Sequence, residues 1–442
     1  MYTISLEVFQ NILSHGIRDV NRFFKPVFRA RNERAVEHHS RNRGGNQDFL
    51  KQVNRRKVLN LLRSGGPLSR TELALASGLD NKSITNIANH FLERRIVVST
   101  GLRESSSGRR KEHLKINSDH AFAIGLDLGA SHITGILLDL DGQAAGEKSC
   151  TFRFGLGGSI ILERLMVLTR ALIEESRVAP SSILGIGFTA PGFHDKERGV
   201  WEIAYNISGW KSLPIGEILR SEFRLDVFLQ DCSRSMALAE MWYGEGKRLD
   251  NFVLLDLGQG IGLGIVIDGR LYEGSNGKSG EVGHLVVDPG GRECSCGNRG
   301  CLEATASGTA IAGIVTDEVK RGVRSKVLEV VNGRVDEITA LDVVQAANHG
   351  DPLAVEVMRK AGLSIGKALS YVINLLNPGL VILGGQLANA GPCLIDPLVE
   401  SAGGFTLPGL FRDTSIKISK LGRLSASVGA ATIVLNEKVF KL

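Results

Sequence analysis

The 442-residue chain has little cysteine and no long apolar run. No apolar segment approaches the ~20 residues that span a bilayer, and the first residues lack the apolar core and small-residue site of a signal peptide. We therefore expect a cytoplasmic protein with no membrane partner. A reducing compartment disfavours disulfides, so the six cysteines need another explanation.

Neither sign of charge dominates the chain, whose net charge is +6, but the charges are unevenly distributed. Residues 1–120 contain 22 Lys and Arg against 11 Asp and Glu, whereas the remainder contains 31 against 36. This asymmetry favours a basic module that meets a polyanion, joined to a mildly acidic body. The alternative is a basic surface that contacts only solvent. The length exceeds what one hydrophobic core organises and predicts two or three domains.

A helix-turn-helix pattern lies in the basic part. Apolar spacing predicts a first helix from Phe49 to Ser64, which the following Gly-Gly-Pro ends. A short second helix is predicted with Ser69 as N-cap and Glu72 as its capping-box partner. Gly78 closes this helix and supplies the turn.

A third helix is predicted to begin at the N-cap Asp80. Its buried stripe consists of Ile84, Ile87, Ala88, Phe91 and Leu92, and its polar face of Lys82, Ser83, Thr85, Asn86 and Asn89. A second helix with a polar face after a glycine turn fits the major groove of DNA. The five polar residues are therefore the candidate contacts to base edges and phosphates. A small helical domain that binds protein is the alternative.

Two short β-prone runs follow Arg95 around a tip rich in Ser, Gly and Arg, which is typical of a wing. Arg109, Arg110 and Lys111 on this tip would enter a narrow minor groove or contact phosphates. Residues 46–118 are thus predicted to form a winged helix-turn-helix domain with its linker. Residues 1–45 are a basic extension, either a disordered arm or an upstream extension of the reading frame.

Three of the six cysteines fall within eight residues of a segment that also contains a histidine. Cys294, Cys296 and Cys301 have metal-ligand spacing, with His284 within reach of them. In a reducing compartment such a cluster favours zinc, whereas Cys150, Cys232 and Cys393 are isolated and expected to be buried. A fortuitous cysteine cluster is the alternative.

The body repeats a strand, a glycine loop and a second strand. Asp127 and Gly129 stand in the first loop, Gly258 and Gly260 in the second, and a third glycine turn falls within residues 377–391. Glycines let backbone N–H groups approach a phosphate, although tight turns need glycine as well. The repeats predict a two-lobed α/β body with a cleft between duplicated halves.

Over about residues 47–442, these motifs resemble the ROK family of repressors and sugar kinases. The winged helix with its GRR linker resembles the repressor branch, DLGASH resembles the first phosphate loop, and GIGFTAPGFHD with NISGW resembles the sugar-site segments. CSCGNRGCLE is the most specific motif. The resemblance implies an α/β fold in which a winged helix-turn-helix precedes a two-lobed actin-like ATPase (duplicated ribonuclease H-like) body, residues 119–442.

The resemblance also implies functional residues. His284, Cys294, Cys296 and Cys301 would hold a structural Zn²⁺ with all four positions filled. Glu281, His284, Glu303, Asn206, Asp231 and Gly192 would form the sugar site. Carboxylates suit this task because each accepts two hydroxyl donors. The match is less specific at Asn206, for which turn chemistry is the alternative.

The kinase motif is altered where the resemblance places the general base. Gap-free alignment puts Asp231 on the family's asparagine and Cys232 on its catalytic aspartate, although a one-residue slip would let Asp231 serve. Ala130, Ser131, His132, Gln259 and Gln386 also depart from the phosphate loops. We therefore expect no catalytic residue and no ATP binding.

Two hypotheses follow, a sugar-responsive transcriptional repressor and an ATP-dependent sugar kinase with an attached DNA-binding domain. The altered loops favour the first. The expected partners are a double-stranded DNA operator and a monosaccharide or sugar derivative, and the expected assembly is a homodimer or a dimer of dimers. A purely structural zinc protein is disfavoured because Glu281 and Glu303 stand beside the metal ligands.

Overall fold

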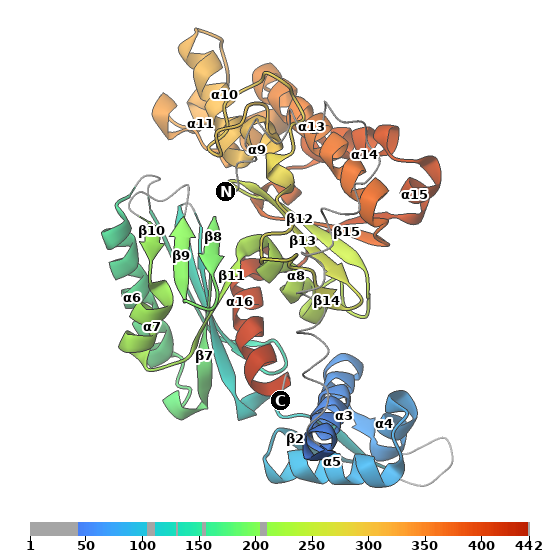
Figure 1. The fold of residues 1–442 in the computed structure, drawn as a ribbon. Helices are drawn as coiled ribbons and strands as arrows, with labels where there is room; N and C mark the ends of the chain where they lie inside the picture. Colours follow the sequence, from blue (N-terminus) through green and yellow to red (C-terminus); the bar gives the residue numbers. More distant parts are fainter. Residues whose placement is uncertain (1–42, 104–110, 130, 153–155, 204–209, 441–442) are drawn as a thin grey trace, which may run out of the picture. The chain divides into compact units, whose positions relative to one another are not determined.

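The computed structural model describes residues 43–103, 111–129, 131–152, 156–203 and 210–440 (Figure 1). Arg109, Arg110, Ala130 and Asn206 therefore lie outside the described residues. The chain divides into two compact units, Met1–Asn54 and Arg55–Leu442. No helix in the described ranges is long and apolar enough to cross a membrane.

The predicted helix-turn-helix is present with the predicted caps. Helix α3 (Arg43–Gly65) precedes α4 (Arg70–Ser77) and α5 (Asn81–Glu93). Both hydrogen bonds of the capping box between Ser69 and Glu72 form, and Gly78 ends α4 in the left-handed conformation with φ 68°. The side chain of Asp80 accepts a hydrogen bond from the N–H of Ser83.

Helix α3 begins before its predicted start at Phe49, within the segment to which the sequence pattern assigned no structure. Residues 43–48 contain two glycines and no apolar side chain, so they carry no helical periodicity. The wing is a three-stranded antiparallel sheet in the order β1-β3-β2. Its strands are β1 (Leu68–Ser69), β2 (Val97–Arg103) and β3 (Lys111–Ile116).

The body contains two five-stranded sheets with the same topology, which confirms the predicted duplication. Their orders are β11-β7-β4-β5-β6 and β14-β13-β12-β15-β16, with a central antiparallel hairpin and parallel strands beside it in each. The first sheet consists of β4 (Phe122–Leu128), β5 (His132–Asp139), β6 (Ala144–Thr151), β7 (Ile183–Ala190) and β11 (Val227–Asp231). The second consists of β12 (Phe252–Leu257), β13 (Ile261–Ile267), β14 (Arg270–Leu271), β15 (Leu380–Gly384) and β16 (Ser415–Ile418).

Helices cover both faces of the first sheet, so its central strands are apolar on both sides. On one face α6 (Gly158–Glu175) packs against β5 and β6, and on the other α16 (Ser425–Leu435) packs against β4 and β7 (Figure 1). A Cβ at Gly125 would lie 1.9 Å from the backbone oxygen of Ser427, so glycine is needed for this close approach. Helix α7 (Ile215–Phe223) and the small sheet β8 (Phe193–Asp195), β9 (Val200–Ile203) and β10 (Lys211–Leu213) complete this lobe.

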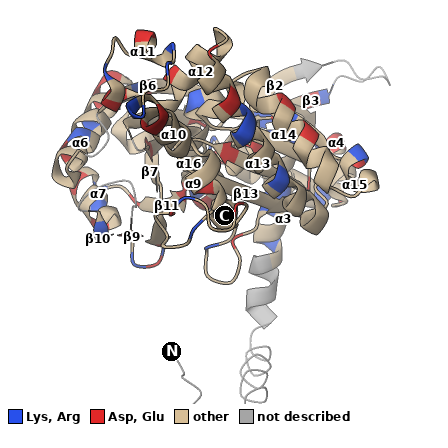
Figure 2. Ribbon diagram, turned by 90° about the horizontal axis from the view of Figure 1, so that it is seen from above, with Lys and Arg blue, Asp and Glu red and all other residues tan. Residues whose placement is uncertain are grey.

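The second lobe holds the metal-ligand loop and most of the remaining helices. These are α9 (Leu302–Ala306), α10 (Gly308–Lys320), α11 (Val327–Val330), α12 (Ala340–Asn348), α13 (Pro352–Leu376), α14 (Pro392–Phe405) and α15 (Pro408–Asp413). Short helical turns are η2 (Ser118–His120), η3 (Pro180–Ser182), η4 (Val282–His284), η5 (Val335–Glu337), η6 (Gln386–Asn389), η7 (Gly422–Leu424) and the π-turn η8 (Asn436–Phe440). Figure 2 shows basic and acidic residues interspersed over the helices of the body.

Helix α8 (Cys232–Tyr243) connects the two sheets. It follows β11 of the first sheet directly, packs against β12 and β13 of the second, and crosses α16. The crossing is tight, because a Cβ at Gly429 would lie 1.7 Å from the backbone oxygen of Ser235. The first turn of α8 is thereby placed where strands of both sheets end.

Candidate metal centre and effector site

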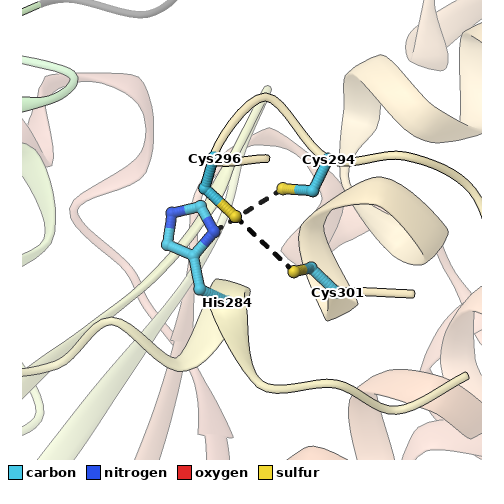
Figure 3. Close-up of side chains that lie close together, drawn as sticks. All are labelled: His284, Cys294, Cys296 and Cys301. Atoms are coloured by element: carbon cyan, nitrogen blue, oxygen red, sulfur yellow. Dashed lines mark hydrogen bonds between the residues drawn. The ribbon is translucent and has the colours of Figure 1, made fainter. Parts of the chain in front are cut away.

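The four predicted metal ligands converge in the structure (Figure 3). One ligand atom from each of His284, Cys294, Cys296 and Cys301 lies within 4.8 Å of all the others. His284 ends the turn η4, Cys301 caps α9, and the loop between them carries the other two thiols. Cys294 and Cys301 are buried.

Two of the distances between these atoms match the edges of a tetrahedral metal site with such ligands. The Cys296 and Cys301 sulfurs lie 3.8 Å apart, and the Cys294 sulfur lies 3.6 Å from Nδ1 of His284. Bonds of about 2.3 Å to sulfur and about 2.0–2.1 Å to nitrogen at tetrahedral angles require edges of about 3.8 and 3.6 Å, respectively. Three thiols and one imidazole also match a closed structural zinc site in their chemistry.

Local backbone geometry shapes the loop that carries the thiols. Gly297 and Gly300 have φ angles of 92° and 74°, which side-chain-bearing residues rarely adopt. A Cβ at Gly300 would also lie 1.7 Å from the backbone oxygen of Asp288. At the bend, the N–H of Gly297 donates a hydrogen bond to the backbone oxygen of Cys294. The thiols of Cys294 and Cys296 thereby turn toward the same point.

Two carboxylates flank the metal-ligand loop. Glu281 immediately precedes η4, and Glu303 lies in the first turn of α9. The N–H of Ile261 donates to Oε2 of Glu303 at 3.1 Å. Desolvation raises the pKa of Glu281 to about 7, with further contributions from the carboxylates of Asp231 and Glu303 and an opposing one from Arg234. Asp231 and Glu303 thus lie within electrostatic range of Glu281.

Asp231 caps α8 and pairs with an arginine that the sequence analysis did not single out. Its Oδ1 accepts from the N–H of Arg234 at 3.0 Å, and its Oδ2 accepts from Nε of the same residue. Arg234 is buried and also donates to the oxygen of Gly277 at 2.5 Å. The spacing of an N-cap aspartate and an arginine three residues later is a local signal for this pair.

Gly192 lies at the same edge of the first sheet. Ala190 pairs with Asp231 at the carboxyl ends of the parallel strands β7 and β11, and Gly192 follows with φ 98°. The neighbouring His194 stacks on Trp201 with ring centroids 4.9 Å apart. Burial lowers the pKa of His194 to about 4, so its imidazole is neutral. His194 and Trp201 were also missed by the sequence analysis, because their contact forms only when β8 and β9 pair.

Cys232 and His132, two of the predicted departures from the kinase motif, both contact Asp127. The Cys232 thiol donates to Oδ1 of Asp127 at 3.8 Å, and His132 Nε2 lies 3.1 Å from Oδ2 of Asp127. Burial and the nearby carboxylates raise the pKa of Cys232, whereas the hydrogen bond to Asp127 raises that of His132. A Cβ at Gly129 would lie 2.1 Å from the His132 ring. The imidazole therefore lies directly against Gly129.

The second glycine loop, around Gly258 and Gly260, forms hydrogen bonds within itself and with Thr309 of α10. The Thr309 hydroxyl donates to the backbone oxygen of Gln259 at 3.0 Å and lies 3.2 Å from its side-chain oxygen. The N–H of Gly258 donates to the oxygen of Gly260 at 3.1 Å. Below the loop, burial and the carboxylates of Asp127 and Asp231 raise the pKa of Asp256 to about 7. The N–H of Gly258 and the hydroxyl of Thr309 therefore have partners within the chain.

The candidate DNA contacts lie on the face of α5 opposite its buried stripe. Lys82, Thr85, Asn86 and Asn89 are exposed, and Ser83 is half-buried. Two hydroxyls are engaged locally, since Ser83 donates to Asp80 and Thr85 to the oxygen of Asn81. Lys111 begins β3. The amide oxygen of Asn89 accepts a hydrogen bond from Arg70 at 3.4 Å. The amide of Asn86 and the ammonium group of Lys82 are therefore the most available members of this set.

The ROK family model matches residues 123–437, and a relative matches nearly the whole chain. The chain belongs to the ROK family. The xylose repressor of Caldicellulosiruptor bescii is 31% identical over 393 residues, which cover 89% of this chain and 98% of the repressor.

Solved structures of regulators and kinases resemble different extents of this ROK chain. A ROK transcriptional regulator described as a homologue of the Escherichia coli Mlc protein covers 89% of it and 97% of its own chain, with TM-score 0.73 and 30% identity. A ROK glucokinase from Streptomyces griseus, solved with glucose and AMPPNP, covers 71% of it and 99% of its own chain, with TM-score 0.64 and 26% identity. The regulator comparison covers more of this chain than the kinase comparison does.

Proposed function

We propose that this ROK chain is a transcriptional regulator that represses carbohydrate-utilisation genes and responds to a sugar. The observation that carries the proposal is the presence of a capped helix-turn-helix with its wing in front of the ROK body. Gap-free alignment, which puts Cys232 at the position of the kinase base, supports it. The named xylose repressor and the regulator structure, which cover both parts, support it.

DNA would be bound by the exposed face of α5 and by the wing. Lys82, Asn86 and Asn89 present donors and acceptors of the kind that reach phosphates and base edges. Arg109 and Arg110 would add phosphate or minor-groove contacts, with Lys111 at the start of β3. One winged helix covers one half-site, so a homodimer would bind a palindromic operator.

The sugar would bind between the metal-ligand loop and the first turn of α8. Glu281, Glu303 and His284 approach it from the second lobe, and Asp231 and Gly192 from the first; Asn206 completes the proposed set. Several carboxylates with few competing cations suit a ligand rich in hydroxyl donors. A structural Zn²⁺ on His284 and the three cysteines would fix this side of the site, and in that role it supplies rigidity rather than an open coordination position.

Phosphoryl transfer is disfavoured by the groups at the expected base. Cys232, like Cys150 and Cys393, is half-buried rather than buried as expected. Desolvation still raises the pKa of its thiol, which stays protonated, and Asp231 has both oxygens engaged by Arg234. A general base must be free to accept a proton from the attacking hydroxyl. His132 against Gly129 in the first glycine loop and Gln259 in the second further disfavour ATP.

Thermal-shift measurements on the purified protein with a panel of monosaccharides, with and without ATP, test the effector site. A ligand that binds only the folded state raises the melting temperature, so we expect one sugar to do so without ATP. Operator binding is then measured with and without that sugar. No shift with any sugar, or no sugar-dependent change in operator affinity, contradicts the proposal.

Coupled ATP turnover with the same sugar separates the regulator from a kinase. We expect no ADP release above that of a sugar-free control. The match to the glucokinase over the body is the observation that favours the alternative. Sugar-dependent turnover would assign the base to Asp231.

A further inference from the structure

A half-buried arginine forms the centre of a contact between the DNA-binding part and the body. Within the unit Arg55–Leu442, the guanidinium of Arg63 lies 4.1 Å from the centre of the Trp242 ring and 5.9 Å from that of Phe440. The two rings meet edge to face with centroids 4.8 Å apart. Arg63 belongs to α3, Trp242 to the last turn of α8 and Phe440 to η8, so three elements converge on one cation.

The cation at this contact is incompletely paired. Nε of Arg63 donates to the Asn60 side chain at 3.3 Å, but Nη1 is buried and has no hydrogen-bond partner among the described residues. Burial also lowers the pKa of Arg63. The aromatic faces replace only part of the lost hydration. The contact is therefore sensitive to the position of Trp242 beneath the guanidinium.

Helix α8 joins this contact to the effector site. It begins after Asp231 and ends at Tyr243, and its 12 residues span about 18 Å at 1.5 Å per residue. Its flanks are packed without spare room, since a Cβ at Gly264 would lie 2.5 Å from Cβ of Ala237 and one at Gly429 would lie 1.7 Å from the Ser235 oxygen. A helix packed this closely shifts as a unit.

We propose that Arg63 is the positioning residue through which α8 transmits the occupancy of the effector site to the DNA-binding part. Sugar contacts at the first turn of α8 displace the helix, and Trp242 at its last turn then holds α3 differently through Arg63. This inference rests on the function proposed above. Because the contact lies away from the sugar and DNA contacts, it affects their coupling rather than either binding site.

The test compares operator affinity with and without a saturating amount of the sugar found by thermal shift. The variants are Arg63→Met, Trp242→Leu and their combination, and Arg270→Met is the control because Arg270 is an exposed arginine of the body. We expect the ratio of the two affinities, about 5- to 150-fold in a coupled regulator, to fall at least fivefold toward one in each variant. Sugar affinity and bound zinc should stay unchanged. The double variant should show the same ratio of operator affinities as each single variant.

The outcomes separate this inference from the proposed function. An unchanged ratio in Arg63→Met and Trp242→Leu, with a sugar response intact in the unmodified protein, overturns the role of Arg63 alone. A ratio of one in the unmodified protein overturns the proposed function and this inference with it. If Arg63→Met does not fold, Arg63→Lys decides, since it keeps the charge but loses the flat stacking surface. A normal melting temperature with a reduced ratio supports the inference, and a normal ratio overturns it.

Discussion

Glu303 divides its two carboxylate oxygens between the fold and the proposed ligand. Oε2 accepts from the N–H of Ile261, which fixes the side chain at the start of α9. The second oxygen can accept a sugar hydroxyl. A glutamine keeps an oxygen for Ile261 but loses the charge, so the substitution separates ligand binding from folding.

Glu303→Gln should abolish or strongly weaken the sugar response while operator binding without sugar and bound zinc are retained. A hydrogen bond to a charged group contributes about 1.5–3 kcal/mol, so sugar affinity should fall about 10- to 100-fold. The measurements are thermal-shift titration and metal analysis. Glu293→Gln, an exposed residue of the same loop, is the control and should behave as the unmodified protein. If Glu303→Gln and Glu293→Gln bind the sugar with the same affinity, Glu303 does not contact the sugar.

Asp256 should make the protein less stable as the pH rises. Its pKa in the folded state is raised from an ordinary 3.8 to about 7, so the protonated form is favoured by folding. The associated stability is present below about pH 4 and is lost as the pH rises to about 7. Asp256→Asn should therefore raise the melting temperature at pH 8 more than at pH 5, by about 2–4 °C for each kcal/mol regained. Asp396→Asn, at an exposed position, should show no such pH-dependent gain.

At the scale of secondary-structure elements, the sequence predicts those features that depend on residues close together in the chain, such as helix caps. Ser69, Gly78 and Asp80 delimit α4 and α5 because capping is a local interaction. The cysteine cluster was found for the same reason. The contact of Arg63 with Trp242 was not predictable, because nothing near either residue in the sequence indicates a partner from another element.

The recognition helix α5 offers separate tests of phosphate and base contacts. Lys82→Ala should weaken binding to all DNA sequences and reduce the slope of log affinity against log salt by about one, because one phosphate contact is lost. Asn86→Ala should cost about 1–3 kcal/mol on the operator and little on unrelated DNA. Fluorescence anisotropy over a salt series measures both. Lys211→Ala, in the body, serves as the control, and an equal effect of all three substitutions would argue against this helix as the reader of DNA.

At the scale of the whole molecule, the second lobe depends on a loop with little apolar content of its own. Residues 288–300 contain no Val, Ile, Leu, Met or aromatic side chain. Hydrophobic burial cannot order such a loop. Bonds from its side chains to the metal would order it instead. The ligands all belong to this lobe. Leu73, Ile84 and Phe91 of the winged helix instead lie in a hydrophobic cluster that continues into the first lobe and α8 and includes no residue of the metal-ligand loop.

Chelation or Cys296→Ala should destabilise the body and leave the winged helix folded. Structural zinc contributes up to ~10 kcal/mol to folding, so loss of the metal should lower the first melting transition strongly. Calorimetry with metal analysis measures this. Cys393→Ala, a cysteine outside the cluster, should keep both zinc and the melting profile. Native protein without zinc would refute the assignment.

The packing of α16 on the first sheet has a consequence for how the protein is made. The glycines that receive this helix, Gly125 and Gly187, are synthesised long before Ser427 and Ala430, whose backbones lie against them. Until the last helix leaves the ribosome, one face of the first sheet remains uncovered, and its closure depends on contacts distant in sequence. Such topologies fold slowly, so a nascent chain that stalls before Ser425 presents an apolar sheet to its neighbours, and aggregation competes with completion of the fold.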